Sequence, residues 1–254
     1  MSKPRVAIFD FACCEGCQLQ IVNMEEELLD LLEIVEPVTW REAMSEKSDE
    51  FDIAFVEGSI TRPQDEERLE HIRDRADILV ALGACATIGG VNRMKNNFDL
   101  DEVKECVYGV ASEMPHLETG PTKAVHEVVE VDYKIHQCPM NKDEFSYVVR
   151  CLAMGKEPVI PDYPVCVDCK ANGTVCRWEH GEVCLGVITR AGCGAPCPSN
   201  GLWCYGCRGL APENNAEAAQ EVIEDYDLSI EDLKDKLVLF NSETEAIREE
   251  DADV

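Results

Sequence analysis

The sequence is short of positive charge. It has 23 Lys and Arg against 51 Asp and Glu, so the formal net charge is −28 at pH 7 over 254 residues. A nucleic-acid-binding protein needs a basic surface that neutralises phosphates, and this composition therefore excludes nucleic acid as a partner. Much of the acid lies at the end of the chain. We expect residues 212–254 to form an acidic, partly helical tail that stays solvated and is not a specific docking segment.

Long apolar runs are also missing. No stretch approaches the roughly 20 residues that span a bilayer, and the first residues, MSKPRVAIFDF, show neither a secretory apolar region nor a twin-arginine pair. We therefore expect a cytoplasmic protein without a transmembrane segment. Because cytosolic thiols stay reduced, a disulfide framework is a poor explanation for the 15 cysteines. Their odd number and their CxxC pairs indicate metal ligation.

The first 160 residues alternate between strand and helix patterns. The predicted strands are apolar runs at residues 5–11, 38–40, 51–58, 77–84 and 130–139. The predicted helices follow at residues 18–35, 63–75 and 141–155. Strands separated by helices are typical of an α/β protein with a parallel, doubly wound sheet. We expect the flavodoxin-like order of strands.

A break with three prolines, GKEPVIPDYP, closes this part of the chain at residues 155–164. Beyond it, residues 161–211 hold eight cysteines and almost no periodic pattern. Such a segment needs an inorganic core because it has too little apolar surface to bury. We therefore predict a flavodoxin-like domain over residues 1–160, a small irregular cysteine-rich domain over residues 161–211, and the acidic tail after them.

Four cysteines follow predicted strands of the first domain. Cys14 and Cys17, in CEGC, follow the first strand, Cys85 follows the strand that ends near residue 84, and Cys138 follows the last. An open parallel sheet binds its ligands beyond the carboxyl ends of its strands. Four thiolates on this edge are the number that a [4Fe–4S] cluster requires. The sequence therefore predicts one such cluster at these four residues.

The surroundings of these cysteines support the same prediction. Gly16 and Gly83 let the backbone approach a ligand closely. Isolated cysteines, in contrast, are usually buried and inert, and we interpret Cys106 and Cys151, in helix-like stretches, as structural. Cys13 could compete with its neighbour in the chain, but the CxxC spacing favours the Cys14 and Cys17 pair.

The cysteine-rich segment supplies eight more thiolates. They are Cys166, Cys169, Cys176, Cys184, Cys193, Cys197, Cys204 and Cys207. Eight thiolates allow two [4Fe–4S] clusters or two zinc sites. Sequential pairing assigns the first four to one site and the last four to the other, while a crossed pairing, as in bacterial ferredoxins, is the alternative. Zinc would not explain the cysteines of the first domain, so iron is favoured.

In combination these motifs resemble the small, electron-transfer subunit of the [NiFe]-hydrogenases, over roughly residues 4–211. The motifs are CEGC, VEGSI at residues 56–60, GACATIGG around Cys85 and the cysteine–proline pair at Cys138. The resemblance implies a flavodoxin-like domain whose four cysteines hold the cluster nearest the nickel–iron centre of a partner large subunit. It also implies that Glu57, which could otherwise be an ordinary strand-end carboxylate, acts in proton transfer or cluster tuning.

The C-terminal motifs are similar to the cytoplasmic, multi-subunit branch of that family. This branch includes NAD(P)-linked and sulfur-linked enzymes and the methanogen enzymes coupled to heterodisulfide reductase. The resemblance implies a middle and a far cluster in the cysteine-rich segment. Where periplasmic members have a histidine ligand this chain has Cys166, and Cys197 matches the place of a proline beside a three-iron cluster. The resemblance thus implies three all-cysteine, low-potential [4Fe–4S] clusters.

The resemblance implies a subunit that carries electrons but does not split hydrogen itself. The nickel–iron centre belongs to the large subunit, and a flavin or iron–sulfur partner chooses the electron acceptor. One alternative is the homologous subunit of respiratory complex I, which passes electrons to quinone and lacks the eight-cysteine domain. Another is a zinc-stapled scaffold without redox function. A flavin-binding flavodoxin is disfavoured because cysteines stand where its phosphate loop needs hydroxyls and amides.

Overall fold

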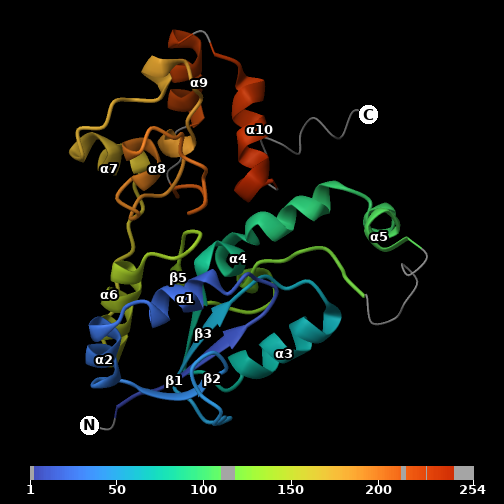
Figure 1. The fold of residues 1–254 in the computed structure, drawn as a ribbon, viewed down its shortest axis with the longest axis vertical. Coiled ribbons are helices and arrows are strands. Elements are labelled where there is room, and N and C mark those ends of the chain that lie inside the picture. Colours follow the sequence, from blue (N-terminus) through green and yellow to red (C-terminus); the bar gives the residue numbers. More distant parts are fainter. Residues whose placement is uncertain (1–2, 110–117, 213–215, 227, 243–254) are drawn as a thin grey trace. The chain divides into compact units, whose positions relative to one another are not determined.

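The computed structural model describes residues 3–109, 118–212, 216–226 and 228–242. The chain forms two compact units, Met1–Pro158 and Val159–Val254. Figure 1 colours the first unit from blue to yellow-green and the second from yellow to red. The division lies inside the proline-rich break. Within the described residues, no helix has the length and apolar character needed to cross a membrane.

A five-stranded parallel sheet forms the centre of the first unit (Figure 1). Its strands are β1 (Arg5–Asp10), β2 (Glu36–Trp40), β3 (Ile53–Glu57), β4 (Ile78–Leu82) and β5 (Tyr133–Ile135). The spatial order is β2-β1-β3-β4-β5, and every neighbouring pair is parallel. This is the flavodoxin order. The predicted α/β fold with a doubly wound sheet is confirmed, and each predicted strand is present. Four of them have narrower bounds than predicted, whereas β2 begins two residues earlier than the expected residue 38.

Helices cover both faces of this sheet. They are α1 (Gly16–Val22), α2 (Glu26–Leu32), α3 (Pro63–Arg73), α4 (Gly83–Ile88), α5 (Leu100–Tyr108) and α6 (Lys142–Ala153), with 3-10 turns η1 (Gly90–Asn97) and η4 (Val125–Glu127). On one face Val56 packs with Leu69 of α3. On the other face Phe55 lies 5.2 Å, between ring centroids, from Phe145 of α6, because successive strand side chains point to opposite faces.

One predicted helix of the first unit is broken into two, and another helix of this unit is not packed on the sheet. The single helix predicted over residues 18–35 was wrong, because the chain breaks it into α1 and α2 at Glu25, where φ is 54°. The break lets Ile21 and Leu31 both be buried on the same side of the sheet.

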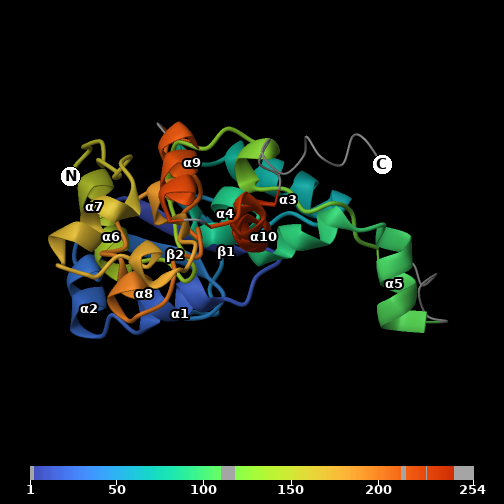
Figure 2. The ribbon, with the colours of Figure 1, turned by 90° about the horizontal axis from the view of Figure 1, so that it is seen from above.

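None of the nine residues of α5, all of them described, is buried, and α5 extends away from the sheet (Figure 1, Figure 2).

The second unit has little regular structure around its cysteines. Its elements are α7 (Val165–Ala171), η5 (Trp178–His180), η6 (Leu185–Val187), α8 (Pro196–Ser199), α9 (Ala216–Asp225) and α10 (Ile230–Asn241). Its apolar core gathers Val165, Trp178 and Leu185 with cysteines of the same segment. Ile188, Ile223 and two leucines of α10 belong to the same core, so the unit has a larger apolar core than the sequence of residues 161–211 predicted.

The acidic segment is helical as expected, but its described part is not a solvated tail. α10 buries Leu233, Leu237 and Phe240, which are spaced four and three residues apart and therefore share one helix face. Leu233 and Leu237 belong to the core of the cysteine-rich segment. The acidic residues of α10 stay on the exposed side, so the net charge of the segment concealed an amphipathic helix. Residues 243–254 lie outside the described part.

Candidate functional site

Four cysteines of the first unit lie at the carboxyl edge of its sheet, and we call them the edge quartet: Cys14, Cys17, Cys85 and Cys138. The pKa of the Cys85 thiol is raised to about 12, mainly by burial and then by negative charge on Cys138 and Cys14. Burial likewise raises the pKa of Cys17, with smaller contributions from Glu57 and Cys85. Three separate loops meet here. The N–H of Ala84 donates to the carbonyl of Gln137, next to Cys138, at 2.9 Å, and a Cβ atom on Gly16, between Cys14 and Cys17, would lie 3.7 Å from Pro139 Cβ.

Glycines leave room around these sulfur atoms. A Cβ atom on Gly83 would lie 2.3 Å from Cys17 Sγ, and one on Gly90 would lie 3.0 Å from Cys85 Sγ. Both glycines also have positive φ, at +81° and +58°. The quartet thus sits in a cradle of bare backbone that any larger residue would fill. Four thiols in such a cradle form a donor set that fits a [4Fe–4S] cluster.

Glu57 anchors one ligand of the edge quartet. It is 2% exposed at the end of β3. Its Oε1 accepts a hydrogen bond from the backbone N–H of Cys17 at 3.0 Å, and its Oε2 accepts one from Gln18 N–H at 3.2 Å. These are among the first N–H groups of α1, which have no partner within the helix. The carboxylate therefore positions Cys17 and adds negative charge beside the thiols.

Replacing Glu57 with Gln is expected to loosen this anchor and to make the reduction potential of a cluster in the edge quartet more positive. The amide oxygen of Gln can accept a hydrogen bond from one of the two N–H groups, so the other hydrogen bond is lost. Losing a hydrogen bond to a charged partner costs about 1.5–3 kcal/mol of stability. Denaturant unfolding and redox titration of the metal-loaded chain measure both effects. As a control, Glu66→Gln breaks a partly exposed pair with Lys123, for which we expect about 1 kcal/mol or less. An unshifted potential in E57Q would contradict the electrostatic role.

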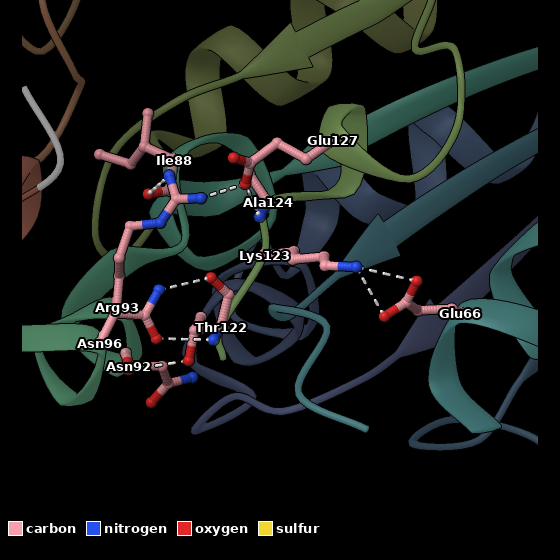
Figure 3. A network of polar contacts seen from close by, with 9 residues as sticks. All are labelled: Glu66, Ile88, Asn92, Arg93, Asn96, Thr122, Lys123, Ala124 and Glu127. Carbon is pink, nitrogen blue, oxygen red and sulfur yellow. Dashed lines mark hydrogen bonds and ion pairs between the residues drawn. The ribbon is translucent and has the colours of Figure 1, made fainter. Parts of the chain in front are cut away.

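A polar network that the sequence did not predict joins η1, which follows α4, to residues 122–127 (Figure 3). Asn92 Nδ2 donates to the carbonyl of Ala12 at 2.8 Å, and Thr122 Oγ1 donates to the carbonyl of Asn92 at 2.9 Å. Arg93 pairs with Glu127. The segment after Cys85 is thereby tied to the loop after β1. An isolated asparagine carries no motif, so no sequence signal marked it.

The three remaining cysteines have different surroundings. Cys13 is half-buried, and its pKa is raised to about 12, mainly by burial and then by the charge of Glu57, with a smaller contribution from Cys85. It therefore lies beside the edge quartet, where it can compete with Cys14. Cys151 is buried in α6, whereas Cys106 is exposed on α5.

Four cysteines of the second unit form what we call the early quartet: Cys166, Cys169, Cys176 and Cys184. The pKa of Cys166 is raised to about 12, mainly by burial and then by charge on each of the other three. A Cβ atom on Gly186 would lie 3.6 Å from both Cys166 Sγ and Cys184 Sγ. The same Cβ atom would lie 3.7 Å from Cys204 Cβ, so sequential pairing of the eight cysteines stays a prediction.

The other four cysteines, Cys193, Cys197, Cys204 and Cys207, form the late quartet. Burial raises the pKa of Cys197, and charge on Cys193 raises it further. Burial also raises the pKa of Cys204, with smaller contributions from Cys184 and Cys207. The N–H of Cys204 donates to Cys184 Sγ at 3.2 Å, so the two quartets adjoin where a crossed pairing would exchange ligands.

Among the described residues, no three His, Cys, Asp or Glu side chains are close enough to hold a single metal ion.

Comparison with known proteins identifies relatives along most of the chain. The family model of the NADH ubiquinone oxidoreductase, 20 Kd subunit, matches residues 14–152. Sulfhydrogenase 2 subunit delta of Pyrococcus furiosus is 39% identical over 238 residues, which cover 93% of this chain and 98% of that protein. A subunit of the F420-non-reducing hydrogenase vhu of Methanococcus voltae is 30% identical over 241 residues, covering 83% of this chain and 84% of that protein.

A solved structure agrees with these relatives. A chain of an NAD+-reducing [NiFe]-hydrogenase in the H2-reduced state is 29% identical with a TM-score of 0.58, over 63% of this chain and 96% of that chain. The family model ends at residue 152, whereas the hydrogenase relatives also cover most of the cysteine-rich unit. The resemblance read from the cysteine motifs is therefore confirmed. The chain belongs to the NADH ubiquinone oxidoreductase 20 Kd subunit family and, within it, to the hydrogenase small subunits, which are components of oxidoreductases.

Proposed function

We propose that the chain carries electrons between the nickel–iron centre of a large subunit and a flavin or iron–sulfur partner, through three [4Fe–4S] clusters. The observation that carries the proposal is that the three loops bearing the edge quartet contact one another at the carboxyl edge of the sheet. An open parallel sheet binds its ligands at this edge. The relatives named as hydrogenase subunits support the same function.

Each cluster would be held by one quartet, so that all twelve ligands are cysteines. When bound, such clusters accept and release single electrons at low potential. The chain's own part is to hold the thiolates and to set the local charge. Buried Glu57 adds negative charge beside the edge quartet, which opposes reduction there. The N–H of Cys204, directed at Cys184 Sγ, has the opposite effect, because a hydrogen bond to a ligand sulfur stabilises the reduced state.

The proposal extends to partners and location. The nickel–iron centre would belong to the large subunit, since the cysteine pairs of this chain are assigned to its own clusters. The relatives' names differ in what they say of the acceptor: one enzyme is called NAD+-reducing, and another is called F420-non-reducing. This variety supports the view that a further subunit selects the acceptor. A complex of this composition would work in the cytoplasm.

Anaerobic purification of the native complex tests the proposal. We expect about twelve irons and twelve sulfides for each copy of this chain, four of each per cluster, with electron paramagnetic resonance signals that appear on reduction. The copurifying large subunit should contain nickel. A colourless chain that holds zinc would overturn the electron-transfer proposal. A complex that lacks nickel and reduces quinone would favour the complex I alternative.

A further inference from the structure

Arg208 is a buried arginine that the cysteine motifs leave unexplained. It is 1% exposed and directly follows Cys207 of the late quartet. Its guanidinium occupies the space beside Gly192, because a Cβ atom there would lie 2.6 Å from Arg208 Nη2. Gly192 in turn directly precedes Cys193. The guanidinium is therefore held between the backbone segments that carry two ligands of the late quartet.

An opposite charge contacts the same loop. Asp168 Oδ2 accepts hydrogen bonds from the N–H groups of Gly192 at 3.1 Å and Gly194 at 3.2 Å. The guanidinium of Arg208 lies beside Gly192 as well, so a positive and a negative side chain both flank the backbone that carries Cys193. A cation and an anion thus act on one ligand with opposite signs.

We propose that these two charges set the reduction potential of the cluster in the late quartet, Arg208 raising it and Asp168 lowering it. The inference rests on the proposed function, since it requires a cluster in that quartet. One-electron reduction adds a negative charge, and a fixed cation stabilises that charge strongly where water is excluded. At 1% exposure the charge of Arg208 is scarcely screened. Both residues act through the ligands and are positioning residues.

Redox titration of the complex, followed by electron paramagnetic resonance, tests the proposal. The variant Cys197→Ser first identifies which signal belongs to the late quartet. Arg208→Met removes the charge. We expect the equilibrium constant for one-electron reduction of the late-quartet cluster to fall about tenfold, so its reduction potential falls by about 59 mV. Arg208→Lys keeps the charge and should retain most of the wild-type potential. Lys170→Met, which removes an exposed charge from the same unit, should leave the late-quartet signal unchanged.

Three results would overturn the proposal. They are an unshifted potential in Arg208→Met, an equal shift in Arg208→Met and Arg208→Lys, and a shift of all three signals together. If Arg208→Met fails to assemble the late cluster, Asp168→Asn decides the matter. Asn can still accept the hydrogen bonds from Gly192 and Gly194 but lacks the charge, so the potential should rise, and an unchanged value would refute the proposal. Iron analysis of the wild-type complex separately tests the proposed function, because a chain without clusters fails before any variant is compared.

Discussion

Gly83→Ala is expected to abolish metal binding at the edge quartet, so that the loaded chain loses about four of about twelve irons. The added Cβ atom would lie 2.3 Å from Cys17 Sγ, closer than non-bonded atoms approach. Either Cys17 or the turn between β4 and α4 must move, and Cys85 lies in α4. Iron analysis and electron paramagnetic resonance should show one signal lost, with the two signals of the other quartets retained.

The matched control is Gly155→Ala. Gly155 also has positive φ, at +66°, but nothing lies within 4 Å of the position that its added Cβ atom would take. Both variants therefore carry the backbone cost of a left-handed alanine, about 1–2 kcal/mol, and they differ in the contact with Cys17. We expect Gly155→Ala to keep all of its iron. A Gly83→Ala chain with its full complement of iron would show that the edge quartet is not the binding site.

Leu237→Ala is expected to lower the free energy of unfolding by about 2–5 kcal/mol, the usual cost of truncating a buried leucine. Leu237 is 2% exposed and packs in the core of the cysteine-rich segment. The cavity would also loosen the contact by which Lys236 Nζ donates to the carbonyl of Val183 at 2.7 Å, next to Cys184. Denaturant unfolding of the metal-loaded chain measures the stability, and the rate of iron release to a chelator reports the loosening.

Ile230→Ala provides the comparison for this prediction. Ile230 lies on the same helix and is 47% exposed, and substitutions at such sites usually change stability by about 0.5 kcal/mol or less. Its iron should be released at the wild-type rate. Equal effects of Leu237→Ala and Ile230→Ala would mean that α10 is a solvated tail after all, and would contradict the packing described above.

Much of the first unit was predictable from local patterns. Apolar runs such as that of β3 are typical of strands buried on both faces, and the alternation with helices indicates a parallel sheet. Parallel strands end on a common edge, so cysteines placed after separate strands were expected to meet there. Cys85 illustrates the point, because it is far in sequence from Cys17 and yet close enough for their charges to interact.

Other features could not be read from a linear pattern. The break at Glu25 was missed because apolar residues keep helical spacing on both sides of it. The packing of α10 was missed because its many acidic residues dominate the composition. Leu233 and Leu237 are nevertheless four residues apart, which is the spacing of one buried helix face. Charge counts describe the whole segment, whereas burial depends on which face of the helix each residue occupies.

The sequence by itself determined the number of thiols and the edge of the sheet on which four of them stand. These properties follow from residue identity and from the direction of parallel strands. The tertiary structure alone decided which groups surround the thiols: the carboxylate of Glu57 at the start of α1, the guanidinium of Arg208 beside Gly192, and α10 over the cysteine-rich core. Such neighbours come from distant parts of the chain, and their charges act through space over distances that no sequence spacing specifies.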